Sequence, residues 1–310
     1  MSIIVENLSK HYGTQKAVDN ISFKVESGQI LGFLGPNGAG KTTTMKMLTC
    51  YIAPSGGNAT VYGKSIKNDQ EAVKKSIGYL PEHNPLYLDM PVIEYLEFSA
   101  AMQGVPKSQI NQAVKNMLVT CGLGAEKHKN IGELSKGYRQ RVGLAQAMIH
   151  DPDVLILDEP TTGLDPNQII EIRKLIKEIG QKKTVIFSTH ILSEVEATCD
   201  RVMIINKGRI IEDSTPELIR KKATGGEVLH ITIEDAPNAD TVIQQLNTVA
   251  TVQSVTEKKE ASNGFVVESK PEESSRKAVF KQCVANNWTL TEMRVEETSL
   301  EDIFRTLTRN

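Results

Sequence analysis

One short segment of the 310-residue sequence combines glycines, a lysine and hydroxyl side chains in an order that suits a chain of phosphates. It reads Gly35, Pro36, Asn37, Gly38, Ala39, Gly40, Lys41, Thr42 and Thr43. Glycines at such a turn let backbone N–H groups close around the phosphates. Lys41 can then reach the β and γ groups, and the Thr42 hydroxyl can face Mg²⁺. The segment predicts a site for a nucleoside triphosphate.

Two adjacent acids follow a second apolar run. The run Val154 to Leu157 is continuous, and Asp158 and Glu159 come directly after it. Such a run is typical of a parallel strand buried on both faces, whose carboxyl end lies where an open α/β sheet binds its ligands. Asp158 can hold the Mg²⁺ shell, and Glu159 can orient or deprotonate an attacking water. The alternative is an ordinary acidic turn before Pro160.

The elements that must position these residues are visible nearby. The apolar run 30–34 predicts a strand before the glycine-rich segment, and residues 43–49 predict a helix after it, whose dipole adds positive potential at the phosphates. A second strand is expected over 184–189, and His190 follows it. Because the tips of parallel strands share one edge of the sheet, we expect His190 to face the γ-phosphate, although a histidine at a strand end is often purely structural.

A third motif opens the helix expected to run to Ile149. It reads Leu134, Ser135, Lys136, Gly137, Tyr138, Arg139, Gln140 and Arg141. Ser135 is a good N-cap and Gly137 keeps the backbone open, so the helix start can bind an anion. This run resembles the signature motif of ABC-type ATPases. Tyr12 stands where that family stacks an aromatic ring on adenine, Leu164 and Asp165 resemble its D-loop, and His190 resembles its switch histidine.

The resemblance covers residues 1 to about 220 and implies an α/β fold. We expect a P-loop NTPase core of the ABC ATPase type over 1–220, with an antiparallel β subdomain and a helical subdomain at about 89–150. It also implies the cofactors ATP and Mg²⁺, with two copies arranged head to tail as a homodimer. Ser135 and Gly137 of one copy would then meet the γ-phosphate held by the other. Glu159 would act as the base and His190 would fix the γ-phosphate.

Glu82 departs from the commonest family pattern, in which a glutamine contacts Mg²⁺ and the attacking water. A carboxylate can accept the same contact but cannot donate, so we expect Glu82 to join Thr42 and Asp158 at the metal and leave its effect on the water open. Lys136 replaces the usual first glycine of the signature and can either approach the phosphates or point to solvent. Tyr12 can instead cover the sheet edge, and Asp165 can be a turn residue or a helix N-cap.

The segment from Glu82 to Tyr95 would, by resemblance, receive the coupling helix of a membrane subunit. Its apolar residues are Pro85, Leu86, Tyr87 and Leu88. They can form that contact, or they can belong to the core of the helical subdomain. The sequence favours neither interpretation.

Beyond Glu217 the pattern changes. Residues 221–226 look like a linker. Strands expected near 228–233, 252–258, 264–268 and 289–295 alternate with helices over 239–247 and 273–286, an order that predicts a small ferredoxin-like α+β accessory domain at 227–310. A last helix is expected over Leu300–Thr308. Such extensions resemble those of export-type, two-component ABC ATPases, including the gliding-motility ATP-binding subunits, as do Leu80-Pro81-Glu82, Leu134 to Gly137 and the ending Ser299 to Phe304.

Composition limits the class of protein. Hydrophobic residues make up 39%, charged residues 24%, and 36 Lys and Arg nearly balance 38 Asp and Glu, so nucleic acid is not expected as a partner. The four cysteines form no C-x-x-C pair and predict reduced, buried thiols rather than a metal site. No secretory signal and no run of about 18 apolar residues is present, so we expect a cytoplasmic protein that does not itself cross a bilayer. The resemblance implies that it is peripheral on the inner face of the cell membrane.

The sequence thus predicts an ATP hydrolase, the subunit that couples ATP-driven dimer closure to a separate integral permease, for export. The alternative is a soluble ABC ATPase acting on ribosomes or DNA, but such proteins usually carry two ATPase units or a long inserted coiled coil, which this chain lacks. A nucleotide-sensing module without catalysis is disfavoured by Lys41, Asp158, Glu159 and His190. The transported substrate would be chosen by the permease and is not encoded here.

Overall fold

The computed structural model describes residues 1–223, 227–235, 238–258, 263–271 and 273–295, with only the backbone considered at 220–223. The chain divides into two compact units, Met1–Pro216 and Glu217–Asn310. The helix expected over Leu300–Thr308 and the ending from Ser299 lie outside the described residues. Each unit is described by itself.

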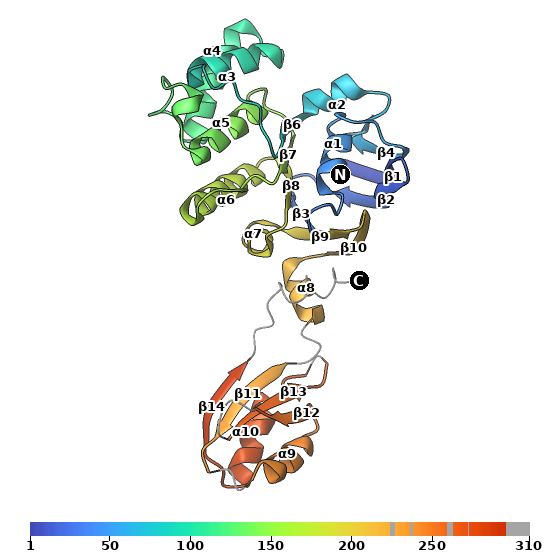
Figure 1. Ribbon diagram of the computed structural model, residues 1–310, viewed down its shortest axis with the longest axis vertical. Coiled ribbons are helices and arrows are strands. Elements are labelled where there is room, and N and C mark those ends of the chain that lie inside the picture. Colours follow the sequence, from blue (N-terminus) through green and yellow to red (C-terminus); the bar gives the residue numbers. More distant parts are fainter. Residues whose placement is uncertain (224–226, 236–237, 259–262, 272, 296–310) are drawn as a thin grey trace. The chain divides into compact units, whose positions relative to one another are not determined.

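A six-stranded, mostly parallel sheet forms the centre of the first unit (Figure 1). Its strand order is β10-β9-β3-β8-β7-β6. The bounds are β3 Ile30–Leu34, β6 Ile77–Leu80, β7 Val154–Asp158, β8 Thr184–Thr189, β9 Arg201–Asn206 and β10 Arg209–Ser214. Only β10 pairs antiparallel within this sheet. Every residue of β3, β7 and β8 is buried, which confirms the expectation of strands covered on both faces.

A four-stranded antiparallel sheet, ordered β2-β1-β4-β5, forms the predicted β subdomain. The bounds are β1 Ile3–Tyr12, β2 Gln15–Val25, β4 Gly56–Val61 and β5 Lys64–Ser65. Helix α1, Lys41–Leu48, shares one hydrophobic core with this sheet and with β3. It begins two residues before the expected start because Gly40 is its N-cap. Helix α2 spans Gln70–Ser76.

Helices make up the rest of the first unit. Their bounds are α3 Val92–Met102, α4 Lys107–Thr120, the 3-10 turn Ile131–Glu133, α5 Lys136–Met148, α6 Pro166–Gly180 and α7 Leu192–Thr198. Figure 1 shows α3, α4 and α5 grouped apart from the antiparallel sheet. Buried residues of these three helices and of α6 belong to the same core as β7 and β8, so the helices rest on the central sheet.

The second unit has the predicted ferredoxin-like topology. Its elements are α8 Pro216–Ala223, which starts at the last residue of the first unit, β11 Val228–Ile233, α9 Ala239–Asn247, β12 Val252–Glu257, β13 Gly264–Ser269, α10 Arg276–Ala285 and β14 Leu290–Val295. All pairings in its sheet, ordered β12-β13-β11-β14, are antiparallel. One hydrophobic core joins α9 and α10 to the sheet.

The expected linker was placed too early. Residues 221–223 belong to helix α8, which starts with a proline and has Glu217 in its first turn. Proline at the first helical position, an acid near the positive end and lysine and alanine near the other end all favour a helix. The glycines at 225 and 226 had suggested an earlier end.

None of the helices among the described residues is both long and apolar enough to cross a membrane. All four cysteines are free; Cys121 and Cys283 are buried, and Cys50 and Cys199 are partly buried.

Candidate functional site

The glycine-rich loop joins β3 to α1 and needs its glycines for conformation and for space. Gly40 has φ 109°, a value that side chains rarely allow, and a Cβ there would lie 2.5 Å from the carbonyl oxygen of Ala17. The loop also folds around its own lysine. The Lys41 ammonium is buried and donates to the carbonyl oxygens of Gly35 at 2.8 Å and Pro36 at 3.3 Å.

A cleft of about 570 Å³ and another of about 510 Å³ lie on either side of Thr42 and Glu82, which line both. Most of the residues predicted to bind the nucleotide line the 510 Å³ cleft. Its lining residues are Tyr12, Gln15, Ala17, Asn37, Gly38, Gly40, Lys41, Thr42, Thr43, Glu82, Glu159, Thr162 and His190. Residues from five stretches of the sequence therefore line one cleft, four of them at the carboxyl ends of the central strands and one from β1 and β2 of the antiparallel sheet.

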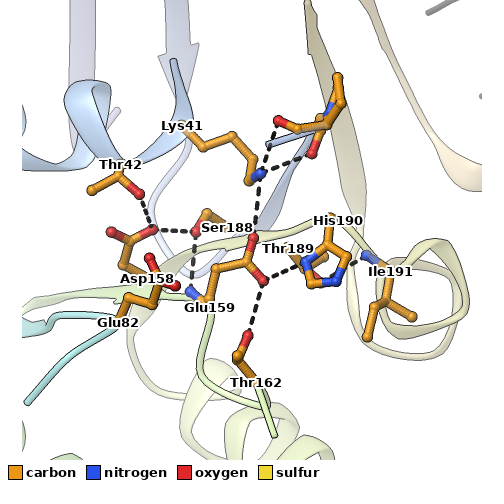
Figure 2. Close-up of polar contacts among 12 residues, drawn as sticks. Lys41, Thr42, Glu82, Asp158, Glu159, Thr162, Ser188, Thr189, His190 and Ile191 are labelled. Carbon is orange, nitrogen blue, oxygen red and sulfur yellow. Dashed lines mark hydrogen bonds and ion pairs between the residues drawn. The ribbon is translucent and has the colours of Figure 1, made fainter. Parts of the chain in front are cut away.

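The Glu159 side chain makes three polar contacts in this cleft (Figure 2). It is 6% exposed; Oε1 lies 3.3 Å from the Lys41 ammonium, and Oε2 accepts from His190 Nδ1 at 2.8 Å and from Thr162 Oγ1 at 3.3 Å. Its backbone N–H donates to the Ser188 hydroxyl at 3.1 Å, and its φ is +50°. A non-glycine residue in this conformation stores strain, which proteins tend to keep at functional positions.

Asp158 is fully buried, and only one of its two carboxylate oxygens accepts hydrogen bonds. Its Oδ1 accepts from Ser188 Oγ at 2.5 Å and from Thr42 Oγ1 at 3.1 Å, whereas its Oδ2 has no hydrogen-bond partner. Burial raises the pKa of this carboxyl above its ordinary value, the two hydroxyls lower the pKa, and Glu82 and Glu159 raise it further. A buried carboxylate oxygen without a donor is a suitable ligand for a hard cation.

Thr42, Asp158 and Glu82 therefore form an oxygen-rich set that fits Mg²⁺. Thr42 and Asp158 touch each other, and Glu82 lines the 570 Å³ cleft together with both. Within the part of the chain that the structure describes, no group of three or more His, Cys, Asp or Glu side chains forms a metal site. Two carboxylates and a hydroxyl leave coordination positions for water and phosphate, which is how proteins usually hold Mg²⁺.

Tyr12 and its surroundings suit a flat ligand. The ring ends β1, is 51% exposed and lines the 510 Å³ cleft. The Lys10 ammonium lies 5.3 Å from the ring centroid and is held by the Ala53 carbonyl oxygen at 2.7 Å. The exposed ring leaves area for stacking on a base.

The signature residues lie apart from both clefts. Ser135 caps α5 by accepting from the Tyr138 N–H at 3.4 Å, and Gly137 packs so closely on Gln168 that a Cβ would lie 2.7 Å from its side chain. Neither residue lines the 570 Å³ or the 510 Å³ cleft. Lys136 is exposed, as expected for a lysine in solvent. Its ammonium lies so close to Gly163 that a Cβ on that glycine would be 2.0 Å from Nζ.

Asp165 has the helix-cap geometry. Its Oδ1 accepts from the Gln168 N–H at 2.9 Å at the start of α6. In the segment proposed to meet a membrane subunit, Leu86 packs against the helical core, while Tyr87 and Leu88 are 54% and 47% exposed. The Tyr87 ring also contacts Phe98, whose exposure is 41%. Leu86 therefore belongs to the core of the helical subdomain, whereas Tyr87 and Leu88 are exposed.

Two site residues were not found from the sequence. Ser188 forms hydrogen bonds with the Asp158 carboxylate and the Glu159 N–H, and Thr162 donates one to Glu159. Ser188 lies 30 positions from Asp158, so no local pattern reveals the contact, and only the register that pairs Asp158 with Ser188 brings them together. Thr162 follows Glu159 within one tight turn, which was a usable signal.

Two family models match the chain. Residues 18–162 match the model described as ABC transporter, and residues 206–308 match that of the ATP-binding protein DrrA1-3-like, C-terminal domain. The chain is 37% identical to the bacitracin transport ATP-binding protein BcrA of Bacillus licheniformis, over 79% of this chain and 80% of that protein. It is 32% identical to the linearmycin resistance ATP-binding protein LnrL of Bacillus subtilis, over 98% and 97%.

A solved structure agrees with these matches. It is that of cbiO1 from Clostridium perfringens, part of the ABC transporter complex cbiONQ, at 33% identity and a TM-score of 0.64, covering 71% of this chain and 93% of that one.

Proposed function

Because this chain belongs to the ABC transporter ATP-binding proteins, we propose that two copies of it close around ATP and drive a separate integral membrane subunit. As a member of the family it binds ATP and is an ATPase. Its nucleotide-binding domain would span 1–220, with a helical subdomain at about 89–150, and 227–310 would form an accessory domain. The names of the similar proteins concern bacitracin transport and linearmycin resistance, and for this chain they support export.

The observation that carries this proposal is the meeting of Lys41, Glu159 and His190 in one cleft, with Asp158 and Thr42 at its edge. Phosphoryl transfer depends on positioning and on neutralising charge more than on covalent chemistry. A buried lysine, a carboxylate within reach of an attacking water and a histidine beside it supply those needs.

The proposed roles follow from these contacts. The backbone N–H groups of the loop and Lys41 bind the phosphates, Tyr12 stacks on adenine, and Glu159 takes a proton from the attacking water. Thr42, Glu82 and Asp158 would hold Mg²⁺, which when bound neutralises phosphate charge. Since Thr162 and His190 hold one oxygen of Glu159, they orient the carboxylate for that proton.

A second copy would complete the site. Ser135 is exposed and lines neither of these two clefts, so it is available to a nucleotide held by a partner, whereas Gly137 is buried against Gln168 in the single chain. The N-terminus of the 13-residue helix α5 favours anions. Such a site is inactive in one copy and assembled on closure, which makes ATP binding a switch for the dimer.

The membrane subunit would dock near the exposed Tyr87 and Leu88, beside the 570 Å³ cleft that reaches Glu82 and Asp158. The protein would then be peripheral on the inner face of the cell membrane. Photo-crosslinking from a probe at Tyr87 to a co-expressed permease tests the contact. A probe at Tyr62, 42% exposed on the antiparallel side, is the control and should give no such product.

The test of catalysis is Glu159→Gln. The amide keeps the size of the side chain but cannot take a proton, so ATP binding should persist and turnover should fall by at least about a hundredfold, the usual size of a general-base contribution. Phosphate release and equilibrium ATP binding measure the two effects. Turnover at the parent rate would refute the role of Glu159.

A further inference from the structure

We propose that Glu194 positions His190 by fixing the direction of the Thr189 hydroxyl. The inference rests on the proposed function, because it concerns the histidine that would contact the γ-phosphate. It goes beyond that function by giving a role to a buried acid of α7 that lines neither the 570 Å³ nor the 510 Å³ cleft. Glu194 is a positioning residue, since it acts through Thr189 and touches neither nucleotide nor attacking water.

The first argument is the presence of an acid where packing alone needs none. Glu194 is 1% exposed, and the other buried side chains of the same stretch of helix include the apolar Leu192 and Val195. Its Oε1 has no hydrogen-bond partner, and its Oε2 accepts one hydrogen bond, from Thr189 Oγ1 at 2.7 Å. A buried carboxyl group destabilises a fold relative to an apolar side chain of similar size. What Glu194 adds in exchange is a hydrogen-bond acceptor directed at Thr189.

The second argument is the single proton of the Thr189 hydroxyl. A hydroxyl has one proton to donate and two lone pairs that accept. Because the proton of this fully buried hydroxyl is directed at Glu194, its lone pairs are left for the Ile191 N–H, which donates to Thr189 Oγ1 at 3.0 Å (Figure 2). A threonine that accepts from the backbone two residues later closes a tight turn. His190 is the residue inside that turn.

The third argument is how the His190 ring is held. Its side chain is 44% exposed and reaches Glu159 Oε2 through Nδ1 at 2.8 Å, so packing alone does not fix the ring. The backbone before it is anchored, because the Thr189 carbonyl oxygen accepts from the Gly35 N–H at 3.3 Å, at the start of the glycine-rich loop. The turn closed by Thr189 Oγ1 anchors the backbone after it. A Thr189 hydroxyl without an acceptor at Glu194 is free to rotate, which releases this turn and the direction of the ring.

The experiment compares Glu194→Leu with Glu194→Gln in the full chain. Leucine cannot accept a hydrogen bond, whereas glutamine keeps an accepting oxygen at the same reach. We expect Glu194→Leu to lower kcat about tenfold with KM for ATP unchanged, since only the aim of His190 is lost, and Glu194→Gln to keep the parent kcat. Leu192→Met, a volume-conserving change at a buried neighbour on α7, is the control and should also keep the parent kcat.

Hydrogen exchange of the nucleotide-free protein, followed by NMR, measures the turn without reference to hydrolysis. The Ile191 amide should exchange about tenfold faster in Glu194→Leu than in the parent, because its acceptor is no longer held in place. Glu194→Gln and Leu192→Met should leave that rate unchanged.

Thermal melting separates positioning from a purely structural role. The melting temperature of Glu194→Leu should equal or exceed that of the parent, because an apolar side chain replaces a buried acid. Thr189→Val removes the hydroxyl directly, so it should lower kcat as Glu194→Leu does, and the double variant should lose no more than either single one. Should Glu194→Leu fold poorly, Thr189→Val against the parent decides the same question.

Two results overturn the inference: parent kcat and parent Ile191 exchange in Glu194→Leu or Thr189→Val, or a loss of kcat in Glu194→Leu that Glu194→Gln shares. His190→Ala separates this inference from the proposed function. If His190→Ala loses turnover while Glu194→Leu keeps it, the proposed function stands and only the role of Glu194 fails. If His190→Ala hydrolyses ATP at the parent rate, the proposed role of His190 fails as well.

Discussion

Replacing Ser188 with alanine tests how Asp158 and Glu159, the two acids of the proposed site, are held. The Ser188 hydroxyl is fully buried, donates to Asp158 Oδ1 at 2.5 Å and accepts from the Glu159 N–H at 3.1 Å. Alanine removes both contacts and adds no bulk. Asp158 would keep one donor, Thr42 at 3.1 Å, and the Glu159 N–H would keep the Ser188 carbonyl oxygen at 3.2 Å.

The expected loss of stability follows from the charge on the acceptor. A hydrogen bond to a charged group is worth about 1.5–3 kcal/mol, and the N–H retains another acceptor, so we expect a loss of about 2 kcal/mol for the first unit. For a unit of this length that lowers the melting temperature by roughly 4–8 °C. Turnover should also fall, because Glu159 and Asp158 share this support.

The loss should depend on pH. Burial raises the pKa of Asp158 above its ordinary value of 3.8 in the folded protein, and the Ser188 hydrogen bond opposes that rise. A carboxyl with a raised folded pKa favours the folded state below its unfolded pKa, and this contribution is lost as pH rises through the folded pKa. Without Ser188 Oγ the folded pKa of Asp158 rises further, so the pH range over which its stabilising contribution is lost extends to higher pH. The difference between variant and parent should therefore grow as pH rises above the folded pKa of Asp158 in the parent, and level off above the folded pKa in the variant.

Urea unfolding of the nucleotide-free proteins at several pH values measures this difference. Ser193→Ala, an exposed serine of α7 that does not line either cleft, is the matched control and should change stability by less than about 0.5 kcal/mol. A Ser188→Ala loss equal to that of the control, or one of the same size at every pH, would show that the hydroxyl does not stabilise charged Asp158.

Further predictions concern the ligand and the tail. Tyr12→Ala should weaken ATP binding about tenfold, within the 1–3 kcal/mol of base stacking, while Tyr12→Phe should not, as a fluorescent ATP analogue can report. Thr162→Val should lower kcat about threefold to tenfold with KM unchanged, because one long hydrogen bond to the Glu159 carboxylate, at 3.3 Å, is lost. Deleting residues 221–310 should preserve ATP binding; on the hypothesis that this tail supports the dimer, the deletion should weaken self-association, and unchanged sedimentation would remove that role.

The motifs predicted the local parts of the site well because each is local in sequence. A glycine-rich turn between a strand and a helix needs no distant partner, and neither does a pair of acids at a strand end, so spacing alone predicted Lys41, Asp158 and Glu159. The ferredoxin-like unit was likewise predicted by its order of strands and helices.

Contacts between strands could not be predicted in the same way. The bond between Ser188 and Asp158 depends on the register of β7 against β8, and the pairing of Lys41 with Glu159 depends on a loop folding back over the sheet. The end of α8 was missed for another reason: glycines after residue 223 outweighed the helix-forming residues before them.

In the nucleotide-free site, Lys41, Glu159 and His190 make contacts with one another that would have to change when nucleotide binds. Lys41 donates to two loop carbonyls and pairs with Glu159, so in the proposed mechanism the lysine leaves Glu159 when it turns to the phosphates. That exchange frees one carboxylate oxygen for a water molecule. The other oxygen accepts from His190 Nδ1, and a carboxylate can only accept, so the Nδ1 proton is committed to Glu159. For His190 to donate to a γ-phosphate as well, its ring must carry a second proton or turn away from Glu159. In the proposed mechanism, ATP binding would therefore free an oxygen of Glu159 and change the protonation or orientation of His190 in one step.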